Sequence, residues 1–473
     1  MKMSSVSTKS VDLRSFCLIA FFALPAVLSA QADINDFLKI QIAGNRVFIE
    51  YDYQMMLDSI DSLNANGACS NLTGYSGWLS SESIPGESAN EFSGFSVAIS
   101  GQGNVLASGA PFNGNNGPGS GATRVYMLEN GSWSQRGQTI YGDFDFDTSG
   151  SHIAMSNDGD VLAIGAPHYD SGNGLMSGLA RVFRYVALNN TWIQVGGDII
   201  GENANDVSGY NIALSDDGNT LAVGAPYNSA NGASAGHVRV YGYDENSAAW
   251  SQLGQDVDGE AVDDLSGYSV SLSGDGGILA IGAVGNDGVA SDAGHVRIYA
   301  INNGAWVQQG QDIGGENAGD NSGHSVSLSG DGSVVAIGAP NNDGSGSNAG
   351  HVRIYSFDNG VWSQKGANID GEANDDLSGW SVSLSSDGET LAIGAKDNDG
   401  GAPDSGHVRV YSFETGSWSQ RAGDIDGDAG NDKSGTSISM SSDGNTLAIG
   451  APNNDDAQTD AGQVKVLRYV SGE

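Results

Sequence analysis

The chain has 473 residues, of which 71 are glycine, 39% are hydrophobic and 16% are charged, and its formal net charge at pH 7 is −38. This composition is typical of a globular chain rich in turns and excludes an intrinsically disordered one. The strong negative charge disfavours binding to nucleic acid or anionic lipid and favours cations, basic partners or a salty medium.

The first thirty residues have the features of a cleaved export signal. Lys2, Lys9 and Arg14 make the start basic. The apolar run at 16–28 is short for a membrane span, and small residues at 28–30 offer a cleavage point. We therefore predict a signal peptide at residues 1–30, a secreted or cell-surface location, and no integral membrane span after cleavage. A retained N-terminal anchor is the alternative.

Residues 31–75 are predicted to form an N-terminal extension. The segment 40–53 suits a hairpin around Gly44-Asn45, and 53–63 has weak helical spacing. Once the signal leaves, Cys69 is the remaining cysteine, so no intramolecular disulfide is expected. Sequons for N-linked glycosylation occur at Asn71, Asn130 and Asn189.

From residue 76 onward the sequence repeats itself. A unit that begins with Ser-Gly recurs seven times, at intervals of 56 to 59 residues. The units begin at Ser93, Ser149, Ser208, Ser266, Ser322, Ser378 and Ser434. A repeat of this length is typical of a solenoid or a propeller.

Each unit reads as four short strands. An alternating Ser-Val-Ser-Leu-Ser strand leads to an Asp-Gly turn, as at Ser329–Gly332. A run of small apolar residues follows, as at 391–395, then a strand such as His-Val-Arg-Val-Tyr at 237–241. A Trp-x-Gln strand, as at 250–252, ends the unit. Four antiparallel strands without a helical period predict a β-propeller blade.

The two ends of the repeat predict a closed ring. The last unit stops after its third strand, at Tyr469, and lacks the Trp-x-Gln strand. A matching segment around Trp78 precedes the first unit. We therefore predict an all-β, seven-bladed propeller of four-stranded antiparallel blades over residues 76–473. The Trp78 segment would complete the last blade and leave no free edge.

Two short motifs in the unit resemble a known repeat. Ser-Gly, often followed by an aromatic residue, opens the first strand, and Gly-Ala-Pro follows the second. Intact Gly-Ala-Pro begins at Gly109, Gly165, Gly224, Gly338 and Gly450. This pairing resembles the FG-GAP repeat, the blade unit of the integrin α-chain propeller and of many exported proteins. The resemblance implies a propeller fold and an adhesive, extracellular role. The family's D-x-D-x-D-G-x-x-D calcium loop is absent, so its calcium residues do not carry over.

Loop carboxylates are the main candidates for a ligand site. Every loop before a Ser-Gly carries two acids four residues apart, and several loops carry more. Because these loops share one face with the loops after the second strands, their carboxylates would surround a hard cation such as Ca²⁺. The candidate Ca²⁺ ligands are Asp256, Asp258, Glu260, Asp264, Asp312, Glu316, Asp320, Asp370, Glu372, Asp376, Asp424, Asp426, Asp428 and Asp432. Equivalent pairs earlier in the chain are Glu87/Glu91, Asp143/Asp147 and Glu202/Asp206. The alternative is that these acids cap the loop backbone or are merely solvated.

Three other residue types recur once per blade. The basic residues are Arg124, Arg181, Arg239, Arg297, Arg353, Arg409 and Lys465. They would bind an anion, or pair with a loop acid or stack on a blade tryptophan. The tryptophans suit sugar binding or packing between blades. The histidines are His237, His295, His351 and His407. They are too far apart to share one metal ion, and a hydrogen bond at the loop edge is the other interpretation.

The functional prediction is a secreted, non-enzymatic binding or adhesion module. No nucleophile–base motif, zinc-protease motif or phosphate loop occurs in the sequence. The expected form is a monomer that engages an extracellular protein or polysaccharide through its acidic loop face, with Ca²⁺ as the cofactor considered. One alternative is an exported hydrolase or lyase that uses loop carboxylates, and another is a multivalent glycan-binding lectin. The non-repeating loops at 113–121 and 168–179 are a further place for a ligand site.

Overall fold

The protein is described from a computed structural model, which covers residues 38–43, 46–51 and 76–471. Two units result, one ending at Ser76 and the other running from Gly77 to Val470. The predicted signal peptide at 1–30, the helical spacing at 53–63, Cys69 and Asn71 lie outside the described residues. Among the residues that are described, no helix is long and apolar enough to cross a membrane.

The first unit contains the hairpin expected around Gly44-Asn45. Strand β1 (Leu38–Ala43) pairs antiparallel with β2 (Arg46–Tyr51). Ala43 lies opposite Arg46, which leaves two residues for the connection. Two-residue loops are the commonest hairpin connections, and Gly-Asn is among the residue pairs that favour them.

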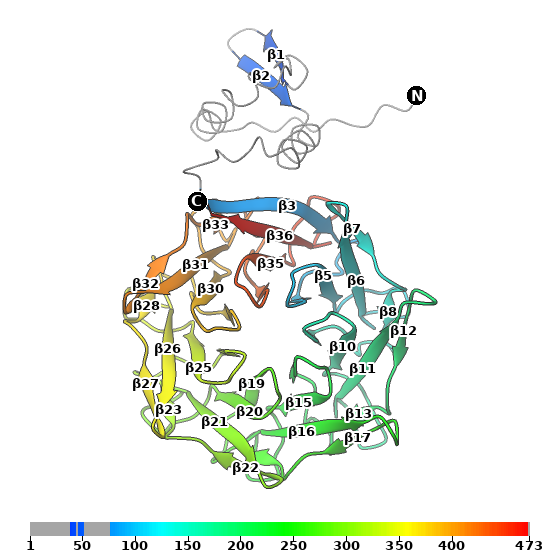
Figure 1. Ribbon diagram of the computed structural model, residues 1–473, viewed down its shortest axis with the longest axis vertical. Coiled ribbons are helices and arrows are strands. Elements are labelled where there is room, and N and C mark those ends of the chain that lie inside the picture. The colour runs from blue at the N-terminus through cyan, green and yellow to red at the C-terminus, as the bar shows by residue number, and fades with distance from the viewer. Residues whose placement is uncertain (1–37, 44–45, 52–75, 472–473) are drawn as a thin grey trace. The chain divides into compact units, whose positions relative to one another are not determined.

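The second unit is a ring of seven antiparallel sheets, as the repeat predicts (Figure 1). In each blade the strands follow one another outward from the centre. The first strands are β4 (Ser96–Ile99), β9 (His152–Met155), β14 (Asn211–Leu214), β19 (Ser266–Leu272), β24 (Ser325–Leu328), β29 (Ser381–Leu384) and β34 (Ser437–Met440). The second strands are β5 (Val105–Ala110), β10 (Val161–Ala166), β15 (Thr220–Ala225), β20 (Ile278–Ala283), β25 (Val334–Ala339), β30 (Thr390–Ala395) and β35 (Thr446–Ala451).

The outer half of each blade contains the third and fourth strands. The third strands are β6 (Ala122–Glu129), β11 (Leu179–Val186), β16 (His237–Asp244), β21 (His295–Asn302), β26 (His351–Asp358), β31 (His407–Glu414) and β36 (Gln463–Val470). The fourth strands are β7 (Ser132–Gln135), β12 (Thr191–Gln194), β17 (Ala249–Gln252), β22 (Ala305–Gln308), β27 (Val361–Gln364), β32 (Ser417–Gln420) and β3 (Gly77–Pro85).

Six blades also have a two-residue strand that the sequence pattern does not predict. These strands are β8 (Ile140–Tyr141), β13 (Ile199–Ile200), β18 (Val257–Asp258), β23 (Ile313–Gly314), β28 (Ile369–Asp370) and β33 (Ile425–Asp426). Each short strand pairs with the part of the third strand that the fourth strand does not reach. The fourth strand and the short strand together therefore form the outer edge of the blade, with a short segment between them that belongs to neither strand. Two residues are too few to show an alternating pattern.

The N-terminal strand closes the ring, as predicted. Strand β3 pairs antiparallel with β36 from Gly77 opposite Val470 to Pro85 opposite Gln463. A register shift between Ser80 and Glu82 lets this one strand cover the whole outer edge of the last blade. The last sheet therefore contains both ends of the repeat region, in the order β3-β36-β35-β34.

The hydrophobic core lies between neighbouring blades. Val352 and Ile354 of the fifth blade, for example, pack with Val382 and Leu391 of the sixth. Every residue of β25 is buried, which explains the run of small apolar residues in the second strands. Burial on both faces is what a strand between two packed sheets requires.

The repeated tryptophans belong to this packing. Trp306 and Trp362 are 3% and 2% exposed. The indole Nε1 of Trp306 donates to the Leu253 carbonyl of the preceding blade at 2.8 Å, and Trp418 donates to Lys365 in the same way at 2.8 Å. Of the two roles considered for these tryptophans, packing between blades is the one observed.

The glycines of the two motifs meet where neighbouring blades touch. A Cβ on Gly338 of Gly-Ala-Pro would lie 2.1 Å from the carbonyl oxygen of Gly379, which follows Ser378 in the next blade. A Cβ on Gly282 would likewise lie 2.0 Å from the carbonyl oxygen of Gly323. Because the colliding atom is main chain, no side-chain rotation relieves the clash. Close approach of blades therefore accounts for the glycine in both motifs.

The turns after the first strands form a continuous ring of main-chain hydrogen bonds around the central channel. In each turn one N–H donates to the carbonyl of the corresponding residue in the next blade, at 2.8 to 3.0 Å. The ring runs through Gly101, Asn157, Asp216, Gly274, Gly330, Ser386 and Ser442 and returns to Gly101. These residues line a cavity of about 140 Å³. The ring satisfies polar groups that would otherwise be unpaired, and it marks the end of the channel opposite the long loops.

Candidate functional site

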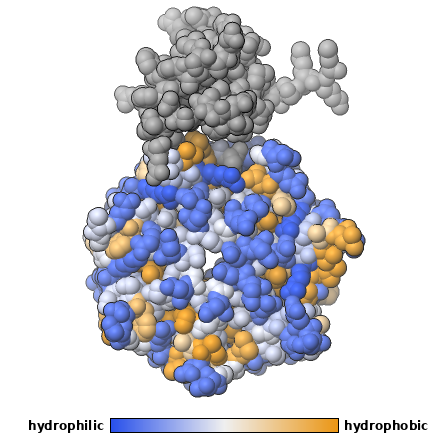
Figure 2. All heavy atoms as spheres, in the orientation of Figure 1, coloured by the Kyte–Doolittle hydropathy of each residue, from blue (hydrophilic) through white to orange (hydrophobic). Residues whose placement is uncertain are grey.

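The long loops of all seven blades lie at the same end of the strands. They connect the outer edge of one blade to the first strand of the next, and the loops after the second strands reach the same end. Main-chain bridges such as Gly350–Ser378 join the two loop sets across a blade boundary. The shared loop face expected from the sequence is therefore present. The propeller surface seen in Figure 2 is largely hydrophilic, with an opening at the centre.

The second acid of each predicted pair is buried and holds the loop backbone. Asp320 and Asp376 are each 2% exposed. One oxygen of Asp376 accepts the Ala373 N–H at 2.9 Å and the Asn398 amide at 3.0 Å. The corresponding acids Asp264 and Asp432 accept main-chain N–H groups at 2.9 Å. These four candidate ligands therefore act as loop caps.

The first acid of each pair meets the ring of basic residues. The nitrogen–oxygen distances are 3.0 Å for Arg124–Glu87, 2.5 Å for Arg181–Asp143, 3.5 Å for Arg239–Glu202, 3.4 Å for Arg297–Glu260, 3.8 Å for Arg353–Glu316, 3.5 Å for Arg409–Glu372 and 3.0 Å for Lys465–Asp428. The acidic and basic rings thus neutralise one another, which is the pairing considered from the sequence. The sequence suggested that these basic residues stack on a blade tryptophan. The guanidinium of Arg239 instead lies over Tyr241 of its own strand, 5.6 Å from the ring centre.

In the first blade the arginine also forms a fully buried pair with the second acid, Glu91. Arg124 and Glu91 are each 1% exposed, and their side chains form two parallel hydrogen bonds of 2.9 and 3.0 Å. The Asn113 amide also donates to Glu91. Arginine holds the pKa of Glu91 below its usual value, although burial alone would raise it. In the third to sixth blades the acid that meets the arginine is the exposed first member of the pair, whereas Arg181 of the second blade also pairs with Asp198 at 2.8 Å.

Aspartates of the short outer strands contribute mainly through their main chain. The carbonyls of Asp258 and Asp370 accept hydrogen bonds from Arg297 and Arg409 at 2.7 and 2.8 Å. Burial, together with the neighbouring Asp256, raises the pKa of the Asp258 carboxyl. Burial and Asp424 raise the pKa of Asp426 in the same way.

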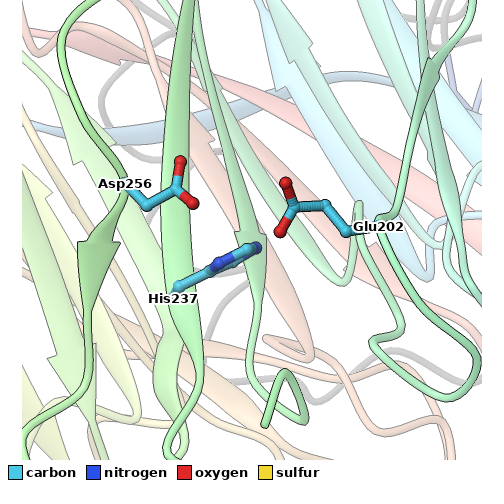
Figure 3. A group of neighbouring side chains, drawn as sticks. All are labelled: Glu202, His237 and Asp256. Carbon is cyan, nitrogen blue, oxygen red and sulfur yellow. The ribbon is translucent and has the colours of Figure 1, made fainter. Parts of the chain in front are cut away.

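The remaining predicted carboxylates gather around buried histidines. Figure 3 shows the His237 imidazole between the carboxylates of Glu202 and Asp256. In each of these clusters the potential ligand atoms lie within 4.8 Å of one another. We call the three clusters the triads, and they are Glu202/His237/Asp256, Glu260/His295/Asp312 and Glu372/His407/Asp424.

Burial favours the neutral form of the triad histidines, and two of these histidines have a ring nitrogen without a hydrogen-bond partner. Burial lowers the pKa of His237, His295 and His407 to about 4. Neither ring nitrogen of His237 has a hydrogen-bond partner, and Nε2 of His295 has none. The loop-edge hydrogen bond expected for His237 is therefore not formed. The fifth blade has His351 and Glu316 at the same positions, but Asn368 replaces the aspartate.

A row of aromatic rings lies at the loop ends of the first strands of neighbouring blades. The residue that follows Ser-Gly is aromatic or histidine in five blades, and in the third to sixth blades these side chains touch in sequence. Tyr210–Tyr268, Tyr268–His324 and His324–Trp380 have ring centres 5.1, 5.2 and 4.3 Å apart. His152 extends the row, 5.6 Å from Tyr210. We call these five residues the aromatic mouth. Sequence reasoning used the aromatic position only for the family resemblance, because one residue per blade gives no local pattern.

A cation already lies on this aromatic surface. Nζ of Lys396 is 4.1 Å from the centre of the Trp380 ring, and it also pairs with Asp397 at 2.8 Å. Ammonium groups bind to aromatic faces in this way. Burial lowers the pKa of His324 to about 4, so this ring is uncharged near neutral pH.

Replacing His324 by Phe is expected to make the protein less sensitive to acid. The unfolded chain binds a proton at its ordinary histidine pKa of 6.5, whereas the folded chain does so only near 4. As pH falls from 6.5 to 4, the wild type therefore loses stability that the variant keeps, on the order of 3 kcal/mol. Denaturant unfolding of both proteins at pH 7 and pH 4 measures this shift. An equal loss in the two proteins would contradict it.

Comparison with known proteins agrees with this architecture. The family model for the FG-GAP repeat matches residues 314–355. No curated protein sequence matches the chain. A solved structure described as a candidate 6-phosphogluconolactonase of Bacteroides uniformis is 14% identical, with a TM-score of 0.50 over 71% of this chain and 86% of that one. The periplasmic gluconolactonase of Pseudomonas aeruginosa is 16% identical, with a TM-score of 0.48 over 78% and 99%.

At 14% identity, the likeness to the Bacteroides structure shows a shared fold and nothing about activity. The matched segment begins at the end of β23, contains β24 and β25 and ends within β26, and its sequence pattern recurs around the ring. The chain is therefore a seven-bladed β-propeller, and its residues 314–355 match the FG-GAP repeat.

Proposed function

We propose that the protein is an exported, non-enzymatic binding module whose loop face receives a basic segment of an extracellular partner. The aromatic mouth is the centre of the proposed surface. The observation that carries the proposal is the unbroken contact of four rings from Tyr210 to Trp380, with an ammonium group already over the last of them.

The charge of the surroundings supports a basic ligand. The exposed first acids of the pairs, such as Glu202, Glu260 and Glu372, lie on the loops of the same face and are 41%, 48% and 46% exposed. The whole chain has a net charge of −38. Long-range attraction then favours encounter with a basic segment, and contact with aromatic rings supplies affinity after desolvation.

The arrangement of the loop acids argues for binding over catalysis. A hydrolase or lyase needs two carboxylates with different pKa values beside one substrate. Here the second acids cap loops and the first acids pair with arginine, in blade after blade. This repetition supplies anchoring charges and does not single out one blade for a reaction. Calcium dependence of the loop face is part of the same proposal.

The test is calorimetric titration of the protein with three probes. The probes are hexalysine, hexaglutamate and a neutral oligosaccharide, each at low and high NaCl, with Ca²⁺ or with EDTA. We expect hexalysine to bind, with an affinity that falls but persists at high salt because stacking on aromatic rings is less screened than exposed charge.

Two outcomes would overturn the proposal. Binding of the neutral oligosaccharide at several equivalent sites, without binding of hexalysine, would indicate the lectin alternative. Hexalysine binding that vanishes at high salt would show only attraction to a negatively charged chain. A stronger response with Ca²⁺ than with EDTA is the result expected if the loop acids use this ion.

A further inference from the structure

Each triad joins two neighbouring blades. Glu202 belongs to the loop that leaves the second blade, after β13, whereas His237 and Asp256 belong to the third blade. His237 begins β16, and Asp256 directly precedes β18, which pairs with the same end of β16. The histidine and the aspartate are therefore fixed by strand pairing, and the exposed glutamate approaches them from the adjacent blade.

The imidazole of each triad is almost completely buried. His237, His295 and His407 are 1%, 3% and 2% exposed. His237 has no hydrogen bond at either nitrogen; Asp258, outside the triad, lies 4.0 Å from Nδ1, and the ligand atoms of Glu202 and Asp256 lie within 4.8 Å of the imidazole. A buried polar nitrogen without a partner costs about 1–3 kcal/mol. A nitrogen left open beside two carboxylates has the arrangement of a metal ligand.

The glutamates are held away from arginine wherever a histidine is present. In the four blades with histidine, the glutamate lies 3.4 to 3.8 Å from the arginine. In the three blades without histidine the equivalent pairs are Arg124–Glu87, Arg181–Asp143 and Lys465–Asp428, and their distances are 2.5 to 3.0 Å. The looser pair leaves the glutamate oxygens free to turn toward the imidazole, and the arginines keep a separate main-chain acceptor, such as Ile200 for Arg239 at 2.9 Å.

We propose that each of the three triads binds one divalent transition-metal ion of the zinc class, with water as a fourth ligand. One imidazole and two carboxylates suit Zn²⁺, Co²⁺ or Ni²⁺ better than Ca²⁺, which prefers six to eight oxygens. Ligand atoms of a tetrahedral zinc ion lie about 3.4 Å apart, given bonds of about 2.0–2.2 Å. Atoms within 4.8 Å reach that spacing through rotation of the exposed glutamate.

The bound ions would cross-link the second blade to the third, the third to the fourth and the fifth to the sixth. The boundary between the fourth and fifth blades provides an internal comparison. There Glu316 and His351 are present, 3.7 Å apart, but Asn368 occupies the aspartate position. An amide is a weaker ligand for zinc than a carboxylate, so this boundary is expected to remain without a metal ion.

The test counts zinc on the full chain. The protein is treated with EDTA, desalted and titrated with ZnSO₄ by calorimetry, and bound zinc is counted by elemental mass spectrometry. We expect three zinc ions per chain, one for each triad. Replacement of zinc by Co²⁺ is expected to give the intense visible absorption of a four-coordinate site, and excess Ca²⁺ is expected not to displace the bound ion.

Two single substitutions make the count specific to the triads. Asp312→Asn gives the fourth blade the ligand set of the fifth, and the count should fall from three to two. Asn368→Asp completes the fifth set, and the count should rise from three to four. Equal melting temperatures of the two variants and the wild type in EDTA check that the fold is intact. No zinc binding, a count unchanged by both substitutions, or displacement by Ca²⁺ would each overturn the proposal.

Discussion

A chain that begins at Ser93 is expected not to form a stable propeller, whereas a chain that begins at Gly77 is expected to fold. The difference between them is β3, which pairs with β36 along the outer edge of the last blade. Loss of β3 leaves the N–H and C=O groups of that edge unpaired and invites aggregation. It also removes the Trp78 indole, whose Nε1 donates to the Arg421 carbonyl of the sixth blade at 3.3 Å.

Circular dichroism and thermal unfolding of the two truncated chains measure this effect. The Gly77 chain is the control, because it lacks only residues that precede the propeller unit. We expect a cooperative transition for the Gly77 chain and little soluble, folded protein for the Ser93 chain. A Ser93 chain that unfolds cooperatively at the same temperature would show that β3 is not needed for closure.

Replacing Arg124 by Met is expected to destabilise the propeller by about 3–5 kcal/mol. Arg124 forms two hydrogen bonds with Glu91, and both side chains are 1% exposed. Without the guanidinium, a buried carboxylate keeps only neutral donors such as the Asn113 amide. Removing one member of a buried pair is costly because the remaining charge cannot reach water.

Arg297→Met is the matched control for this substitution. Arg297 occupies the same strand position, but its partner Glu260 is 48% exposed and 3.4 Å away. Water can solvate that carboxylate, so the expected loss is about 1–2 kcal/mol, mostly from the hydrogen bond to the Asp258 carbonyl. Urea unfolding of both variants gives the comparison. Equal losses would contradict the assigned role of burial.

The blades could be predicted from the sequence because several independent features of each repeat indicate the same four-stranded unit. The alternating first strand, the Asp-Gly turn and the seven-fold spacing all indicate the same unit, and Trp78 indicates the closing strand. The short strands such as Ile369–Asp370 could not be predicted, because two residues carry no periodicity. Their pairing depends on the short segment that precedes them.

The candidate site was only partly predictable. Pairing of the loop acids with the arginines and capping by the second acids were among the expected alternatives. The triads were not expected, because the glutamate of each belongs to one blade and the histidine and aspartate belong to the next. A signal was present: His237, His295 and His407 each follow the loop glutamate by the same 35 residues. Burial of the imidazole, which makes the missing hydrogen bonds significant, appears only in the folded chain.

The central claim is that a basic segment binds at the aromatic mouth, and one calorimetric comparison tests it most directly. Hexalysine is titrated into the wild type, into Trp380→Leu and into Glu414→Gln, which removes an exposed charge at the end of β31 far from the loop face. We predict an affinity about tenfold lower for Trp380→Leu, as expected for the loss of one desolvated cation–aromatic contact, and no change for Glu414→Gln. Equal affinity of all three proteins for hexalysine would contradict the claim.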